Sequence, residues 1–168
     1  MKNNFIELPI STRDGIFLAH YSEKGLAELN FPVGRAFPRA VKLNGIPAKI
    51  KKWYRTTEAA LKKILAGKKS KLPPLDWTGK TDFQKSVWRQ MLKISTGKTK
   101  SYGEIAAAIG KPKAVRAVGG ACGANPVPVL VPCHRVLAAN KKLGGFSGGL
   151  DWKRKLLANE NVKLPSAG

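Results

Sequence analysis

Acidic residues are scarce in this chain of 168 residues, which has ten Asp and Glu against 31 Lys and Arg and a formal net charge of +21. Such an excess indicates a polyanionic partner, because a positive field attracts phosphates and speeds encounter with them. The alternative is a charged surface that serves only solubility. The apolar fraction of 43% is that of a globular protein and excludes a large disordered region.

Long hydrophobic runs are also absent. No window approaches the roughly 20 apolar residues of a membrane span. The opening segment, MKNNFIELPI, has neither the hydrophobic region nor the cleavage motif of a signal peptide. We therefore expect no membrane association and a cytoplasmic location, on the nucleoid in a prokaryote or in the nucleus of a eukaryote.

Cysteine and histidine occur only twice each. With no Cys-x-x-Cys pair, no His cluster and no acidic cage, the sequence predicts no metal site. Cys122 and Cys133 could pair, but a reducing compartment favours two free thiols, one of them a candidate nucleophile. Cys122 has no polar neighbours and is interpreted as a small structural residue in a helix.

Breaks in the hydrophobic pattern organise the first part of the chain. Short apolar runs on either side of residues 22–25 predict a β-hairpin within residues 15–32. Two prolines and an Asn-Gly pair interrupt residues 35–52, which we interpret as a loop. Apolar residues at helical spacing predict a short helix over residues 57–65.

The segment GKKSKLPPLDWTGK, residues 67–80, combines Gly, Ser and adjacent prolines with four lysines. Such a composition is typical of a connection between units. The sequence therefore predicts an N-terminal domain with its linker in residues 1–75 and a C-terminal domain in residues 76–168.

Two capping boxes, T-x-x-Q from Thr81 and S-x-x-E from Ser101, mark helix starts in the second part. Gly110 stands where a helix should end, and Pro112 suits the first turn of another helix that runs to about residue 123. Two short helices separated by Gly-Lys-Pro predict a helix-turn-helix, a common DNA-reading device. An ordinary pair of antiparallel helices would give the same pattern.

The second of these helices, PKAVRAVGGACGAN, carries alanines, glycines and Arg116 on its outward side, where a solvated helix would carry several charges. Gly119 and Gly120 each destabilise a helix by roughly 1 kcal/mol relative to Ala, so a compensating interaction is expected. Small residues let a backbone approach a partner closely and allow Arg116 to enter a groove or a base stack. The alternative is close packing between helices of the chain itself.

The run VPVLVPCHRVL ends a buried-looking apolar segment in Cys133, His134 and Arg135. A free thiol is mostly protonated at pH 7, and only the thiolate is a good nucleophile. Because neighbours in a strand or a helix point in different directions, we expect a bridging water or a backbone bend between thiol and imidazole. Asp151 and Glu160 are the candidates to orient the imidazole. The alternative is that the cysteine is a small hydrophobe in a buried strand.

The segment PVPVLVPCHRVL, the upstream SYGEIAAAIGKPKAVRAVGGACGANP and the downstream GGFSGGLDWKRKLLANE resemble the O6-alkylguanine-DNA alkyltransferase family. The resemblance covers residues 76–162 almost continuously. The segment GIFLAHYSEKGLAELNF resembles the family's N-terminal strands, and residues 31–75 match loosely. The resemblance implies an α/β N-terminal domain (a small β-sheet with a helix) and a mainly helical, winged-helix-like C-terminal domain that contains the helix-turn-helix.

This resemblance implies a DNA-repair methyltransferase that acts once. The alkyl group of O6-alkylguanine, and also of O4-alkylthymine, would pass irreversibly from a base flipped out of double-stranded DNA to the protein itself. The protein would bind the minor groove, use no cofactor, and be a monomer in the absence of DNA.

The resemblance also implies roles for single residues. Cys133 would accept the alkyl group, and His134 would draw the thiol proton through a water while Glu160 orients it. Asn125 would brace the turn before an active-site strand, and Tyr102 would donate a proton to the departing guanine. The implied contacts with DNA are Arg116 in the gap left by the base, Tyr102, Gly103 and Lys111 at the backbone, and Val136, Phe146 and Ser147 at the base.

Phe146 is a departure from the family pattern, since many relatives have Tyr there; the ring is kept and the hydroxyl is lost. Two other functions stay open. Alkyltransferase-like proteins share the helix-turn-helix and flip the lesion but lack the acceptor cysteine, which is present here as Cys133. A thiol hydrolase would leave both the charge and the glycine-rich helix without a purpose.

Overall fold

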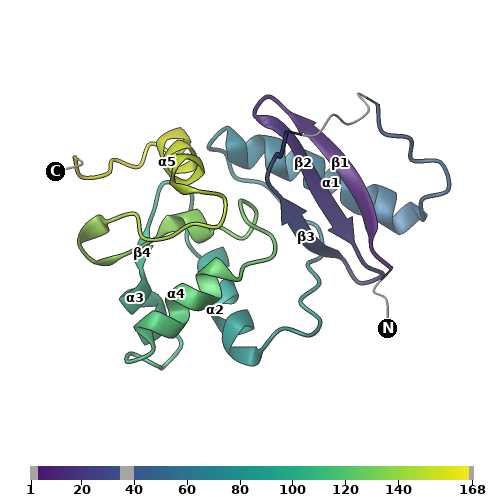
Figure 1. Ribbon diagram of the computed structural model, residues 1–168. Helices are drawn as coiled ribbons and strands as arrows, with labels where there is room; N and C mark the ends of the chain where they lie inside the picture. Colours follow the sequence, from purple (N-terminus) through teal and green to yellow (C-terminus); the bar gives the residue numbers. More distant parts are fainter. Residues whose placement is uncertain (1–3, 35–39, 167–168) are drawn as a thin grey trace.

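The computed structural model describes residues 4–34 and 40–166. Three antiparallel strands, β1 (Ile6–Thr12), β2 (Gly15–Tyr21) and β3 (Leu26–Asn30), form a sheet in the order β1-β2-β3 (Figure 1). The predicted hairpin is the β2–β3 pair, in which Leu18 faces Asn30 and Ala19 faces Leu29. That prediction is confirmed.

Helix α1 (Ala48–Leu65) packs one long apolar stripe against this sheet. Two buried hydroxyl groups join the layers, with Tyr54 donating to the Pro9 carbonyl at 2.9 Å and Tyr21 donating to Thr57 at 2.8 Å. The helix is longer than the predicted residues 57–65, and the interpretation of residues 35–52 as loop is wrong from residue 48 onward. Pro47 immediately precedes the helix with φ −54°, a conformation that suits a helix start. Residues 35–39 lie outside the described residues.

Residues 66–81 connect α1 to the next helix without a helix of their own. Leu75 forms a bridge with Leu26, and the Leu26 amide donates to the Pro74 carbonyl at 2.8 Å. The connection therefore runs beside the start of β3 before it enters the second half.

The second half is mainly helical, with α2 (Asp82–Leu92), α3 (Tyr102–Ala108), α4 (Val115–Gly123) and α5 (Leu150–Asn159). Both predicted capping boxes are formed at the starts of α2 and α3. Gly110 has φ +74°, and the Lys111 amide donates to the Ala106 carbonyl at 2.9 Å, as in a Schellman motif. The predicted helix end is confirmed.

Helix α4 begins at Val115, so the prediction that Pro112 starts it is wrong. The Ala114 amide donates to the Lys111 carbonyl at 2.9 Å, which closes a turn with Pro112 in its second position. Proline has the required φ there as well as in the first turn of a helix. The two helices α3 and α4 still follow one another as the predicted helix-turn-helix.

A short parallel pair, β4 (Lys100–Ser101) with β5 (Val136–Leu137), brings the start of α3 next to the cysteine segment. Inside this half, the Trp88 indole of α2 donates to the Ala121 carbonyl of α4 at 2.8 Å. Buried side chains of both halves join in a single hydrophobic cluster. Among the residues that the structure describes, no helix has both the length and the apolar character needed to cross a membrane.

Candidate active site

Cys133 lies in a single 3-10 turn, η1 (Cys133–Arg135), and not in a strand. The prediction that the active-site cysteine lies in a strand is therefore wrong. Val129 has φ +74°, and the Arg135 amide donates to the Pro132 carbonyl at 3.0 Å, so the backbone turns sharply on both sides of residues 130–132. Of the two expected features, a bridging water or a backbone bend between thiol and imidazole, the bend after Pro132 is present. All three side chains of the turn are buried.

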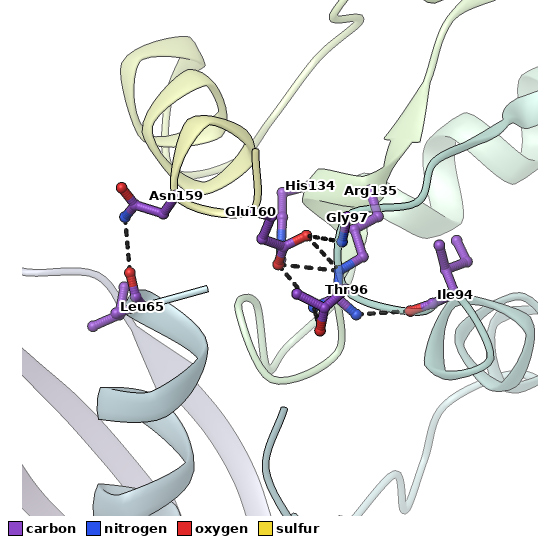
Figure 2. A network of polar contacts seen from close by, with 8 residues as sticks. All are labelled: Leu65, Ile94, Thr96, Gly97, His134, Arg135, Asn159 and Glu160. Atoms are coloured by element: carbon purple, nitrogen blue, oxygen red, sulfur yellow. Dashed lines mark hydrogen bonds and ion pairs between the residues drawn. The ribbon is translucent and has the colours of Figure 1, made fainter. Parts of the chain in front are cut away.

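Glu160 receives the imidazole of His134, with 2.9 Å between Oε1 and Nε2 (Figure 2). It follows α5 directly and shares an inward stripe with Leu156 and Leu157, since residues three and four apart lie on one helix face. Asp151, the other candidate, is exposed on the first turn of α5 and contacts Arg154 at 3.4 Å.

The Nδ1 atom of His134 is buried and has no hydrogen-bond partner among the described residues. Since Glu160 is an acceptor, a neutral ring carries its proton on Nε2, and Nδ1 is left as the basic nitrogen. Burial lowers the pKa of His134, although Glu160 opposes that effect. The imidazole is therefore neutral at pH 7 and able to take up a proton.

Arg135 holds the other side of Glu160 (Figure 2). Its Nε donates to Oε2 at 2.9 Å, its Nη2 donates to Oε1 at 2.8 Å, and its Nη1 donates to the Ile94 carbonyl at 2.7 Å. The Gly97 amide adds a hydrogen bond to Oε2 at 3.3 Å. Burial alone would raise the pKa of Glu160, but the hydrogen bonds and charges of His134 and Arg135 outweigh it and lower the pKa to about 2.

Burial raises the pKa of the Cys133 thiol, and the Asn125 side chain and the Lys153 charge only partly oppose this. The resting thiol is therefore protonated, and it needs a base before it can attack. Cys122 is also buried, and burial raises its pKa to about 12. Of the two thiols, only Cys133 stands in sequence beside an imidazole with a free basic nitrogen.

Lys153 is a part of the site that sequence reasoning missed. Its ammonium group is fully buried and donates to the carbonyl of Val136 at 2.8 Å, to that of Gly145 at 3.2 Å, and to that of Leu143. It thereby ties the loop before α5 to β5. Its position seven residues before Glu160, on the same apolar stripe, is the signal that could have indicated a buried lysine.

Asn125 and Tyr102 approach the site from the helix-turn-helix side. The Asn125 amide donates to the Val131 carbonyl at 2.8 Å, and its oxygen accepts from the Val127 amide at 3.0 Å, so it braces the turn before η1. Tyr102, at the start of α3, lies so close to Gly144 that a Cβ there would be 2.6 Å from its hydroxyl oxygen. Burial raises the pKa of Tyr102, and the phenol keeps its proton at neutral pH.

The three residues predicted to contact the base lie in or beside the loop before α5. Val136 is buried, and its carbonyl already accepts a hydrogen bond from Lys153. The ring of Phe146 is half-buried, and Ser147 is exposed beside a cleft of about 570 Å³ that Asn125 also lines.

The residues predicted to contact DNA lie on α3, α4 and the turn between them. Arg116 and Lys111 are exposed, and Gly103 lies half-buried in the first turn of α3. Among the described residues, a Cβ added at Gly119 or Gly120 would meet no atom within 4 Å outside its own stretch of helix backbone. Close packing inside the chain therefore does not explain these glycines, and the alternative of helix-helix packing is wrong.

The fold and the site define a class of protein: a helix-turn-helix joined to a buried thiol, beside which a buried imidazole is hydrogen-bonded to a buried carboxylate. Residues 82–162 match the family model described as "6-O-methylguanine DNA methyltransferase, DNA binding domain". A methylated-DNA–protein-cysteine methyltransferase of Methanosarcina barkeri is 39% identical over 98% of this chain and 99% of its own length. The one of Mycobacterium tuberculosis is 53% identical over 55% of each chain.

Solved structures agree. The O6-methylguanine methyltransferase of Mycobacterium tuberculosis superposes with a TM-score of 0.72 at 34% identity over 96% of both chains. The enzyme of Pyrococcus kodakaraensis gives a TM-score of 0.61 at 25% identity over 93% of this chain and 98% of that one. The chain belongs to the methylated-DNA–protein-cysteine methyltransferase family. The predicted resemblance and fold class are confirmed.

Proposed function

We propose that this protein repairs O6-alkylguanine in DNA by moving the alkyl group to Cys133. Its relatives over the full length of the chain are named methylated-DNA–protein-cysteine methyltransferase and O6-methylguanine methyltransferase, which supports a DNA-repair methyltransferase. The choice of Cys133 as acceptor is carried by one observation. The sulfur shares a buried turn with His134, whose Nε2 is held by Glu160 and whose Nδ1 has no partner among the described residues.

In the proposed reaction, Nδ1 of His134 takes the thiol proton through a bridging water, and the sulfur attacks the alkyl carbon of the lesion. A carbon–sulfur bond forms as the bond between that carbon and the guanine oxygen breaks. The electron pair stays with the guanine, which takes a proton from the Tyr102 hydroxyl, and the phenolate then regains a proton from solvent. Glu160 stabilises the imidazolium that forms, since its carboxylate stays ionised beside it.

The free small-residue face of α4 supports the proposed DNA contact. A backbone without side chains can enter the minor groove closely, and Arg116 on the same helix would replace the base that flips out. Tyr102, Gly103 and Lys111 would contact the backbone. One oxygen lone pair of Val136, together with Phe146 and Ser147, would contact the base.

The same pocket is proposed to accept O4-alkylthymine, and no cofactor enters the scheme. We also propose that the protein works as a monomer in the cytoplasm. A sensor that binds lesions without repairing them remains the second candidate, and the fate of the alkyl group separates the two.

The test is to incubate the protein with duplex DNA that contains O6-methylguanine and to weigh the intact protein and its peptides. We expect one added methyl group, located on Cys133. Cys133→Ser should gain none but should still bind the lesion, because a hydroxyl is nearly the same size and far less nucleophilic. Cys122→Ser is the matched control and should gain the methyl group normally. Binding without any mass gain in the unmodified protein would identify a sensor.

A further inference from the structure

The loop that carries the proposed base contacts packs against one aromatic side chain from the other half of the chain. Phe31, just after β3, places its ring centroid 5.7 Å from that of Phe146, at an angle of 72° between the rings. It also lies 5.0 Å from Trp152 of α5 and 5.6 Å from Phe17 of β2. Sheet, loop and helix thus meet in one cluster of four aromatic rings.

The same ring rests directly on the loop backbone at Gly148. A Cβ built on Gly148 would lie 2.5 Å from the edge of the Phe31 ring, well inside van der Waals contact. Lack of space, rather than an unusual backbone conformation, therefore requires glycine here. Gly148 adjoins Ser147, so Phe31 packs against the backbone of the loop that is proposed to recognise the base.

A backbone hydrogen bond also joins β3 to the segment next to the site. The Leu29 amide donates to the Pro126 carbonyl at 2.9 Å, next to Asn125. Phe31, Asn125, Ser147 and Gly148 all line the cleft of about 570 Å³. The end of β3 therefore forms part of the surroundings of the site, although it is more than 90 residues before η1 in the sequence.

We propose that Phe31 is a positioning residue for the alkylated base. By packing on Gly148 and Phe146 it holds the loop in the one arrangement that receives the base. The inference rests on the proposed function, since it takes Phe146 and Ser147 as base contacts. Without the ring the loop would sample more conformations, and lesion binding would have to order them first. The chemistry at Cys133 would be unaffected once the base is bound.

The first test compares Phe31→Leu with Phe17→Leu, a matched loss of one ring from the same cluster. For each variant we would measure the ratio of affinities for O6-methylguanine DNA and undamaged DNA, the transfer rate at saturating DNA, and the melting temperature. Phe31→Leu should lower the affinity ratio by about tenfold, the effect of one poorly ordered contact, and leave the transfer rate within about twofold. Phe17→Leu should lower the melting temperature and leave the ratio unchanged. Phe31→Tyr keeps the ring and should behave as the unmodified protein.

The second test is the reciprocal substitution. Gly148→Ala brings a methyl group against the Phe31 ring and should lower the affinity ratio. In a Phe31→Leu background, Gly148→Ala should lower the affinity ratio by a factor that is at least about threefold smaller than in the unmodified protein. The reason is that residues in contact are energetically coupled. An unchanged ratio in Phe31→Leu, or an equal cost of Gly148→Ala in both backgrounds, would overturn the proposal. If Phe31→Leu does not fold, a normal ratio in Gly148→Ala overturns it alone.

The unmodified protein in the same assay keeps this inference separate from the proposed function. If that protein does not methylate Cys133, the proposed function fails. If it does, and the Phe31 variants discriminate lesions normally, only the positioning role of Phe31 fails.

Discussion

Glu160 is the residue on which the buried polar cluster depends. It accepts hydrogen bonds from His134, from Arg135 and from the Gly97 amide, and it is only 5% exposed. A buried charge destabilises a fold unless it is paired and hydrogen-bonded, and here both conditions are met. The carboxylate therefore serves the imidazole and the stability of the fold together.

The low pKa of Glu160 predicts a specific acid sensitivity. A folded pKa of about 2 against an ordinary value of 4.5 means that the unfolded chain binds the proton more readily. The carboxylate thus contributes stability above about pH 4.5 and loses it as the pH falls toward 2, by an amount on the order of 3 kcal/mol. Glu160→Gln should be less stable than the unmodified protein at pH 6, and the difference should shrink by pH 3. Urea unfolding of both proteins across this range measures it. A difference that stays constant with pH would contradict the assignment.

The spacing of the sequence could predict that Glu160 and Lys153 lie on one buried stripe, but not which groups Lys153 contacts. Both lie on the inward stripe of α5 with Leu156 and Leu157. His134 was the expected partner of a carboxylate on this stripe, so the position of Glu160 could be interpreted from the sequence. The partners of Lys153 are backbone carbonyls of the loop before α5 and of β5. No residue type in the sequence announces a carbonyl, and only the fold brings these three together.

At the scale of elements, α4 combines exposed glycines with a single exposed arginine. Arg116 has the role of holding the duplex open in the proposed mechanism and has none in the chemistry. Arg116→Ala should therefore slow repair of duplex DNA at least about tenfold, because extrusion of a base requires a few kcal/mol. Transfer from the free base benzylguanine should stay within about twofold. Parallel rate measurements with both substrates decide the point, and equal losses would place Arg116 in the pocket instead.

Element boundaries followed from the sequence where side chains cap the backbone locally. The boxes at Thr81 and Ser101 and the glycine at position 110 act within a few residues of the chain, so their pattern suffices. Strand β1 was not identified, because Pro9 argues against a strand. The structure accommodates it because β1 is an edge strand, paired only with β2.

The turn η1 was missed for a different reason. An apolar run with prolines at positions 128 and 132 has no helical or alternating period, and the positive φ of Val129 is unusual for a β-branched residue. The run is buried by packing with elements distant in the sequence. Its conformation is therefore set by the tertiary structure rather than by local preference.

At the scale of the whole molecule, the two halves are joined at several points outside the connecting segment. Asn159 donates to the Leu65 carbonyl at 2.8 Å (Figure 2), and Lys155 pairs with Asp14 at 2.5 Å. We still propose a division into domains at about residue 75, because the sheet and α1 precede that point and helices α2 to α5 follow it.

The net charge of +21 predicts binding that depends strongly on salt. Each phosphate contact from Lys or Arg releases a counterion, so the affinity for undamaged DNA should fall at least about a hundredfold between 50 and 200 mM salt. Transfer from free benzylguanine is the control and should change little, since that substrate carries no phosphate. Titrations at four salt concentrations give the slope. A flat profile would mean that the charge serves a different partner.

The last prediction concerns the protein after reaction. Attack on an alkyl carbon leaves a thioether at Cys133. A thioether has no carbonyl to activate and no good leaving group, and His134 and Glu160 offer no second step that would break it. Each chain should therefore repair one lesion. Cys133 is only 4% exposed in a tight turn, and added atoms in a packed interior destabilise by about 1–3 kcal/mol. The alkylated protein should then melt several degrees lower, at about 2–4 °C for each kcal/mol in a chain of this size. Titration with excess methylated DNA, followed by thermal melting of the product, tests both statements. More than one lesion repaired per chain would contradict the single turnover, whereas an unchanged melting temperature would contradict only the crowding at Cys133.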